Sequence, residues 1–93
     1  MVAKNTVIVR NDAILSAAVG GETVLMSAEQ GQYYALTATS HDIWDRLKTP
    51  VRVADLCAAL AEAYGVPLET VETDTLAFLE YLESQAMIKT VQA

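Results

Sequence analysis

The stretch that decides the fold is Gln32–Thr37 (QYYALT), which runs almost directly into Thr39–Trp44 (TSHDIW). The first segment is rich in aromatic residues, which β-strands favour. The apolar positions that follow, Ile43, Trp44 and Leu47, have the spacing of one helix face. The junction therefore predicts a strand over residues 33–36 that passes through a tight turn into a helix.

Two more strands are predicted upstream of the aromatic strand, over Ile14–Val19 and Glu22–Ser27. Gly20–Gly21 between them is a hairpin signal, because glycine reaches positive φ without a steric penalty. Gln30–Gly31 marks the next turn, and Thr6–Val7–Ile8–Val9–Arg10 is a weaker strand candidate. Three strands on short connections predict an antiparallel meander with the aromatic strand at its edge.

Helical spacing predicts three helices in the second half of the chain. Thr39 or Ser40 is expected to cap the first helix, and Pro50 follows its end. The second helix closes near Gly65, the third begins at Pro67 and runs to about residue 85, and an apolar tail at 87–91 packs back on the domain. The predicted fold is α+β, a three-stranded antiparallel sheet followed by three helices, in one domain spanning residues 1–93.

The distribution of charge excludes some partners and favours others. The net charge is −6; residues 1–52 hold five acids and five bases, whereas residues 53–93 hold seven acids and only Lys89. Nucleic-acid binding depends on cationic contacts to phosphates, so this half should repel nucleic acid and attract a basic segment. No apolar run reaches the length of about 20 residues that spans a bilayer, and the start lacks the apolar segment of a secretory signal. We expect no membrane partner and a cytoplasmic location.

The residue types that usually carry catalysis are sparse. His41 is the only histidine, and it stands at a helix start beside Asp42, where side chains are exposed. Cys57 is the only cysteine, and its neighbours predict a buried thiol in a helix. Metal binding needs several converging ligands, and no phosphate loop or nucleophile elbow is present. The sequence therefore predicts no catalytic residue, no cofactor site and no metal site.

Two surfaces are candidates for docking another chain. In the aromatic strand, Tyr34 and Leu36 are expected to face the core, while Tyr33 and Ala35 face the other way. An edge strand has unpaired backbone groups, to which an incoming peptide can add as a further strand. On the third predicted helix a strip of residues lies beside the core stripe of Thr75, Leu79 and Leu82; we call it the third-helix strip, and its members are Val71, Asp74, Phe78 and Tyr81. The acidic residues of that helix also fit a solvated face. Whether this side of the helix docks another chain or faces solvent stays open at this point.

A series of motifs along the chain then indicates a family: ETVLM at 22–26, GQYYALT at 31–37, IWDRL at 43–47, VADL at 53–56, LAEAY at 60–64, and Asp74, Phe78–Leu79, Leu82 and Met87–Ile88. Together they resemble the PqqD-like family, small peptide-binding domains called RiPP recognition elements. The resemblance covers about residues 14–88. It implies a winged helix-turn-helix-like arrangement of three strands and three helices.

The resemblance also implies a function. Family members are non-catalytic; they bind the leader segment of a ribosomally made precursor peptide and present it to modifying enzymes. By resemblance, the strand edge comprises Gln32, Tyr33, Tyr34, Ala35 and Leu36, and the third-helix strip lines the opposite side. Tyr33, Phe78 and Tyr81 are expected to provide apolar pockets, and Asp74 to favour basic leader residues. A short chain of this kind looks most like the lasso-peptide members, which work with a leader protease and a cyclase.

Three positions depart from the family pattern. Thr37 stands where Asn is usual, Arg52 where Thr or Ser caps the second helix, and Ala86 where Gly ends the third helix. The alternatives are a PqqD-type partner of a radical enzyme, a winged-helix nucleic-acid binder, an enzyme based on Cys57 or His41, and a dimer paired through the strand edge.

Overall fold

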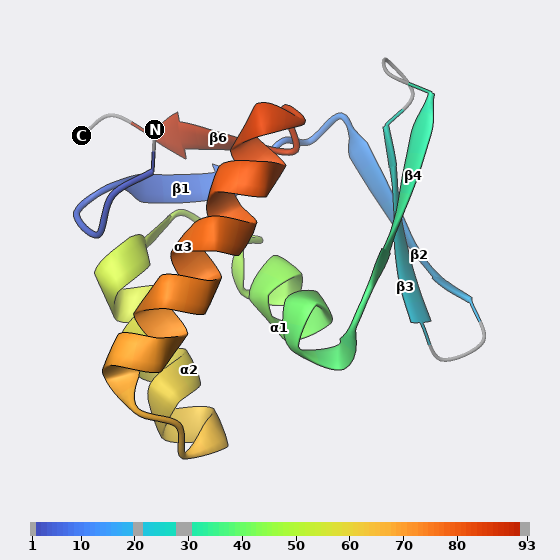
Figure 1. Cartoon of the computed structure of the whole chain (residues 1–93). Coiled ribbons are helices and arrows are strands. Elements are labelled where there is room, and N and C mark those ends of the chain that lie inside the picture. The colour runs from blue at the N-terminus through green and yellow to red at the C-terminus, as the bar shows by residue number, and fades with distance from the viewer. Residues whose placement is uncertain (1, 20–21, 28–30, 92–93) are drawn as a thin grey trace.

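The computed structural model of the chain describes residues 2–19, 22–27 and 31–91. The elements in chain order are β1 (Val7–Arg10), β2 (Ile14–Val19), β3 (Glu22–Ser27), β4 (Gln32–Leu36), α1 (Ala38–Arg46), β5 (Val51–Arg52), α2 (Val53–Tyr64), α3 (Leu68–Ser84) and β6 (Ile88–Val91) (Figure 1). The α+β class and the three predicted helices are confirmed. The hairpin predicted at Gly20–Gly21 lies outside the described residues, as does Gln30.

The predicted meander is present as the sheet β2-β3-β4, with both strand pairs antiparallel. Leu25 of β3 lies opposite Tyr34, and Thr23 lies opposite Leu36. Since side chains alternate across a strand, Tyr34 and Leu36 share the inner face with the fully buried Leu25. Among the described residues β4 pairs only with β3, so it is the edge strand that the sequence predicts.

A second small sheet, with strand order β5-β1-β6, was not predicted. The weak candidate at the N-terminus is β1, which pairs with β6 from Val7 opposite Val91 to Arg10 opposite Ile88. The apolar tail therefore packs back on the domain as a strand. Its partner is about eighty residues away in the sequence, and no local pattern encodes such a pairing.

The helix ends differ in part from the sequence expectations. Thr37, not Thr39 or Ser40, caps α1: its side-chain oxygen accepts a hydrogen bond from the Ser40 N–H. The prediction was two or three residues late because the strand ends at Leu36 and the helix follows at once. Gly65 ends α2 in the left-handed conformation, as predicted.

Arg52 precedes α2 without a side-chain cap. Instead, the N–H groups of Val53 and Ala54 donate to the backbone carbonyls of Thr6 and Lys4, at 2.9 Å each. Backbone from the N-terminal segment thus satisfies donors that a Ser or Thr side chain would otherwise bond.

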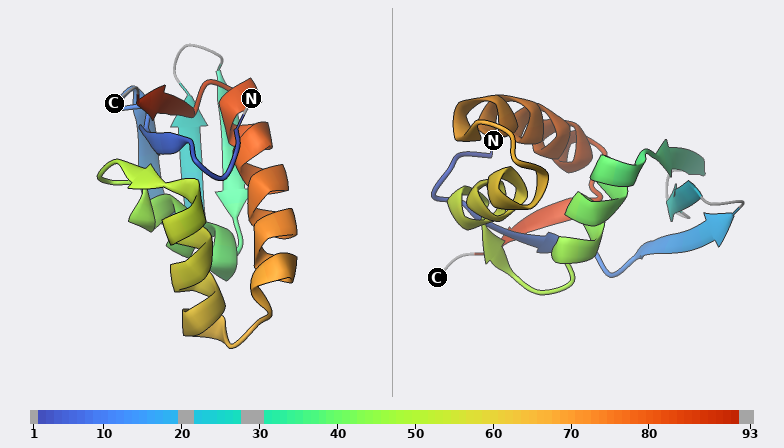
Figure 2. Two further views of the ribbon diagram at one scale, coloured as in Figure 1. Left: turned by 90° about the vertical axis from the view of Figure 1, so that its left-hand side faces the viewer. Right: turned by 90° about the horizontal axis from the view of Figure 1, so that it is seen from below.

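The core lies where the three helices meet both sheets (Figure 2). Trp44 of α1 is its largest fully buried side chain. The guanidinium of Arg10 lies 4.8 Å from the Trp44 ring centre, and its Nε donates to the Trp44 carbonyl. These contacts fix α1 against β1. Because β4 leads directly into α1, they also fix the position of the C-terminal end of β4. Within the described residues, no helix combines the length and the apolar character needed to cross a membrane.

Candidate peptide-binding site

The edge strand β4 lies beside α3, and the two run in opposite directions (Figure 1). Both views of Figure 2 show β4 as the strand of its sheet that is nearest to α3. The third-helix strip (Val71, Asp74, Phe78 and Tyr81) belongs to α3, and we now call it the α3 strip. The five residues of β4 extend over about 17 Å, and the α3 strip rises about 15 Å along the helix. A short extended segment can therefore follow both along their whole length.

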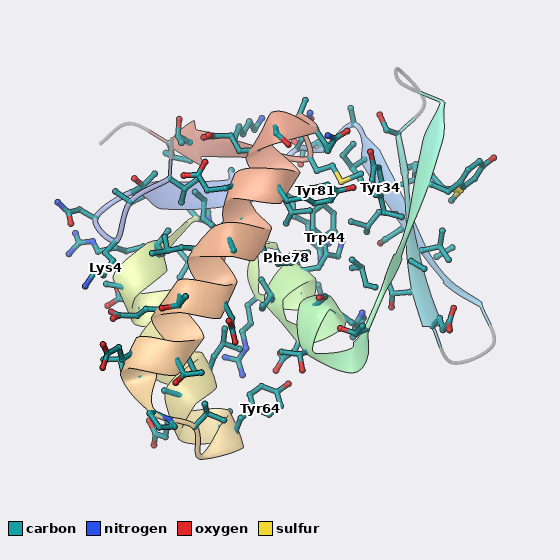
Figure 3. All side chains as sticks on the ribbon, in the orientation of Figure 1. Lys4, Tyr34, Trp44, Tyr64, Phe78 and Tyr81 are labelled. Carbon is teal, nitrogen blue, oxygen red and sulfur yellow. The ribbon has the colours of Figure 1, made fainter. Side chains whose placement is uncertain are left out.

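Two tyrosines connect β4 to α3 at one end of this surface (Figure 3). The rings of Tyr34 and Tyr81 meet edge to face, with centroids 5.7 Å apart. The Tyr34 hydroxyl also donates to Oε1 of Gln85, at 2.7 Å. Burial and a hydrogen bond with Tyr81 raise the pKa of Tyr34, so its hydroxyl stays protonated and available as a donor.

At the other end, where β4 passes into α1, three helices surround a pocket of about 300 Å³. Its apolar walls come from α1, α2, α3 and the turn between the last two. The lining residues are Thr39, Ser40, Ile43, Leu60, Tyr64, Val66, Val71, Asp74, Thr75 and Phe78. Three of the four members of the α3 strip are among them. A pocket of this size and lining suits one large apolar side chain of a bound chain.

A hydrogen-bonded group holds Tyr64 at this pocket. The Tyr64 hydroxyl donates to Oδ2 of Asp42 at 2.7 Å, and Arg46 Nε donates to the other carboxylate oxygen at 2.9 Å. These bonds lower the pKa of Asp42, the one from Tyr64 contributing most. The last residue of α2 is thus tied to α1, and the position of its ring sets the width of the pocket.

The structure divides the predicted site residues between two sides of the sheet. Tyr34 and Leu36 belong to the inner face, and Val71 and Phe78 pack against the core as well as lining the pocket. Tyr33 is 74% exposed and lies on the outer face, opposite to Tyr34. The structure therefore does not bring the Tyr33 side chain together with Phe78 and Tyr81, and the apolar pockets expected from these three residues stay a prediction. Only its backbone belongs to the β4 edge, together with that of Gln32 and the exposed Ala35.

Asp74 lines the pocket from α3 and is exposed. In the part of the chain that the structure describes, it has no ion-pair partner. Tyr64 and Val66, by contrast, were not predicted as site residues. The sequence signals at Tyr64 were its place at the end of an apolar helix stripe and in the LAEAY motif, and neither tells a core position from a pocket wall.

The geometry gives no support to catalysis at the two candidate residues. Cys57 is fully buried, and burial raises the pKa of its thiol away from the reactive thiolate. His41 is exposed, and its Nδ1 shares a 2.6 Å hydrogen bond with the Thr23 hydroxyl rather than with a carboxylate. No group of three or more metal-ligating side chains occurs within the described ranges.

Comparison with known proteins identifies a family and two similar solved structures. The profile of the family described as coenzyme PQQ synthesis protein D (PqqD) matches residues 22–88. Among curated protein sequences there is no match. A solved structure, TbiB1 in complex with the TbiA(beta) leader peptide, is 29% identical, with a TM-score of 0.79 over 91% of this chain and 99% of that one. A second, lasso peptide synthetase B1 complexed with the leader peptide, is 26% identical, with a TM-score of 0.77 over 88% of this chain and 96% of that one.

Proposed function

Because this chain belongs to the PqqD family, we propose that it binds the leader segment of a ribosomally made precursor peptide and serves lasso-peptide biosynthesis. The observation that carries the proposal is the edge strand β4, paired only with β3 among the described residues, beside an α3 strip of matching length. Two structures similar over nearly their whole length contain a leader peptide. Their likeness supports the same ligand class here.

The leader adds to the sheet as a strand next to β4. The Ser27 carbonyl accepts a hydrogen bond from the Gly31 N–H, so it points toward the β4 side of β3. Backbone groups alternate in direction along an antiparallel pair. The N–H and C=O groups of Tyr34 and Leu36 are then the ones that hydrogen-bond to β3. Those of Tyr33 and Ala35 point to the open edge. These two residues provide the backbone bonds to the leader.

Side chains of the bound strand that point inward meet the α3 strip and the pocket. One large apolar leader side chain enters the pocket beside Phe78, and Asp74 at the same wall favours a basic neighbour. Backbone pairing plus such an anchor can supply about 8 kcal/mol, which corresponds to micromolar affinity. The complete proposed site is the β4 edge with Gln32, Tyr33, Tyr34, Ala35 and Leu36, and the α3 strip with Val71, Asp74, Phe78 and Tyr81.

In this proposal the protein is a non-catalytic carrier in the cytoplasm that presents the precursor to a leader protease and a cyclase. Service to a radical enzyme, as in pyrroloquinoline quinone assembly, is the alternative within the same family. Nucleic-acid binding is disfavoured, since the half of the chain that holds α2 and α3 carries seven acids against one lysine.

A proline at residue 35 tests strand addition directly. Ala35→Pro removes an N–H that points to the open edge, and edge strands tolerate proline where no ladder bond is lost. We expect leader affinity, measured by calorimetry with a synthetic lasso-precursor leader peptide that the wild-type chain binds, to fall at least about tenfold, since a lost bond leaves a leader acceptor unsatisfied. Ala35→Thr keeps the N–H and is the matched control. Equal affinity of the two variants would contradict strand addition at this edge.

A further inference from the structure

Three exposed apolar side chains lie together at the turn between α2 and α3. Tyr64 is 46% exposed, Val66 36% and Leu68 46%. All residues from 62 to 70 are exposed, although the helices on both sides of the turn pack into the core. We call Tyr64, Val66 and Leu68 the turn rim. Single exposed apolar residues are common on protein surfaces, but a cluster of them marks contact with another molecule more often.

The turn rim is continuous with the pocket of the proposed leader site. Tyr64 and Val66 line that pocket, whereas Leu68 lies outside the lining, two residues beyond Val66. Two residues of extended chain span at most about 7 Å. Figure 3 shows Tyr64 at this end of the molecule, with Phe78 farther along α3. An occupant of the pocket therefore has the turn rim directly beside it.

Hydrogen bonds hold the turn rim in one shape. The Tyr64 hydroxyl donates to Asp42 of α1, and the Val66 N–H donates to the Ala61 carbonyl at 3.3 Å. Gly65 between them has φ of 63°, the left-handed conformation that closes this helix end. A surface that is already ordered loses little conformational entropy when a ligand binds to it.

A leader that continues past the end of β4 reaches the turn rim. Thr39 and Ser40 follow β4 closely and line the same pocket as Tyr64 and Val66. The pocket thus extends from the end of the strand edge to the turn rim. Alternate side chains of an extended peptide point the same way, about 7 Å apart. This spacing fits one side chain in the pocket and another at Leu68.

The charges beside the turn rim indicate which kind of peptide fits there. Residues 62–70 contain Glu62 and Glu69 and no basic residue. Neither glutamate has an ion-pair partner in the described part of the chain, and Asp74 in the pocket wall is a third acid. Such a surface attracts a cationic side chain and repels a phosphate or an acidic segment. The ligand that fits is an apolar residue with a basic neighbour.

We propose that the turn rim is a second apolar subsite for the leader, which takes an apolar side chain two or three positions beyond the residue held in the pocket. The proposal rests on the proposed leader binding and deepens it. The leader is then recognised at three places: by its backbone at the β4 edge, by one large side chain in the pocket, and by a second side chain at the turn rim. A leader that lacks either side chain binds more weakly, so their spacing contributes to selectivity.

The test measures the coupling between Leu68 and single residues of the leader. Affinity is measured by calorimetry with a synthetic lasso-precursor leader peptide that the wild-type chain binds, and with versions of it in which each apolar residue in turn is replaced by alanine. The protein variant is Leu68→Gln, which keeps a good helix former at an exposed site. Leu15→Gln changes another exposed leucine, in β2, and is the matched control.

We expect Leu68→Gln to lower leader affinity at least about fivefold, because apolar contact area is lost, and Leu15→Gln to change it less than about twofold. One alanine substitution in the leader should cost at least about fivefold with the wild-type chain and less than about twofold with Leu68→Gln, because its contact is already gone. Wild-type affinity for Leu68→Gln would overturn the proposal. So would alanine costs that are the same for both chains.

The outcome also separates this subsite from the proposed function. If Ala35→Pro weakens leader binding and Leu68→Gln does not, binding at the β4 edge stands and only the second subsite fails. If the wild-type chain binds no lasso-precursor leader, the proposed function fails, and the second subsite fails with it.

Discussion

Tyr34 and Tyr81 meet edge to face across the boundary between β4 and α3, with an angle of 76° between their rings. This contact fixes the distance between the strand edge and the helix strip at one end of the proposed leader site. At the other end the Tyr64–Asp42 hydrogen bond fixes the pocket. The site is thus held open at both ends by tyrosines that are anchored on different elements.

Removing the Tyr81 ring should loosen this boundary. Edge-to-face pairs contribute about 0.5–1.5 kcal/mol beyond the area they bury, so Tyr81→Ala should lower the free energy of unfolding by at least that much in urea titrations. Tyr81→Phe keeps the ring and is the control. If both variants unfold at the same urea concentration, the ring contact does not stabilise the fold.

Truncating Phe78 should weaken leader binding more than its effect on folding explains. Phe78→Ala enlarges the pocket and removes the apolar wall that a leader side chain would contact. Leu76→Ala is the comparison, because Leu76 also packs against the core from α3 but does not line the pocket. We expect leader affinity to fall at least about tenfold for Phe78→Ala, the equivalent of 1.4 kcal/mol. An equal loss of leader affinity in the two variants would indicate that only fold stability had changed.

Glycine at residue 86 should stabilise the protein. Ala86 has φ of 57° and follows α3 in a Schellman turn, in which the Met87 N–H bonds the Leu82 carbonyl and the Ala86 N–H bonds that of Glu83. An L-residue with a Cβ is strained there by about 1–2 kcal/mol. After the entropy of the more flexible unfolded chain is subtracted, Ala86→Gly should raise the free energy of unfolding by about 0.5–1 kcal/mol. Gln85 has φ of −98°, so Gln85→Gly should instead lower the free energy of unfolding. If Gln85→Gly stabilised the protein, the explanation by strain at positive φ would be contradicted.

The Tyr64–Asp42 bond should make stability depend on pH in the acid range. The pKa of Asp42 is lowered below its usual 3.8, mainly by the Tyr64 hydroxyl. A carboxyl whose pKa is depressed by folding stabilises the fold above its unfolded value, and that stabilisation is lost as the pH falls through the folded value. Tyr64→Phe should therefore be less stable than wild type at pH 7, and the difference should shrink below pH of about 4. Tyr33→Phe, at an exposed tyrosine, is the control, and a difference that stays constant with pH would contradict the assignment.

Much of the fold is determined locally by the sequence. Alternation of apolar residues placed Tyr34 and Leu36 on the core face and left Tyr33 exposed, as the structure has them. The glycine after Tyr64 marked the end of α2, because only glycine enters the left-handed region without strain. Cys57 was expected to be buried from its helical neighbours alone. These features depend on spacing over a few residues.

The tertiary structure alone decided the remaining features. The pairing of β1 with β6 and the backbone cap on α2 join segments that are far apart in the chain. The pocket draws its walls from three helices, and the Tyr64–Asp42 bond joins two of them. Sequence periodicity states which face of an element is apolar, but it does not state which distant element that face meets. That choice follows from how all the apolar faces can be buried at once in a single core.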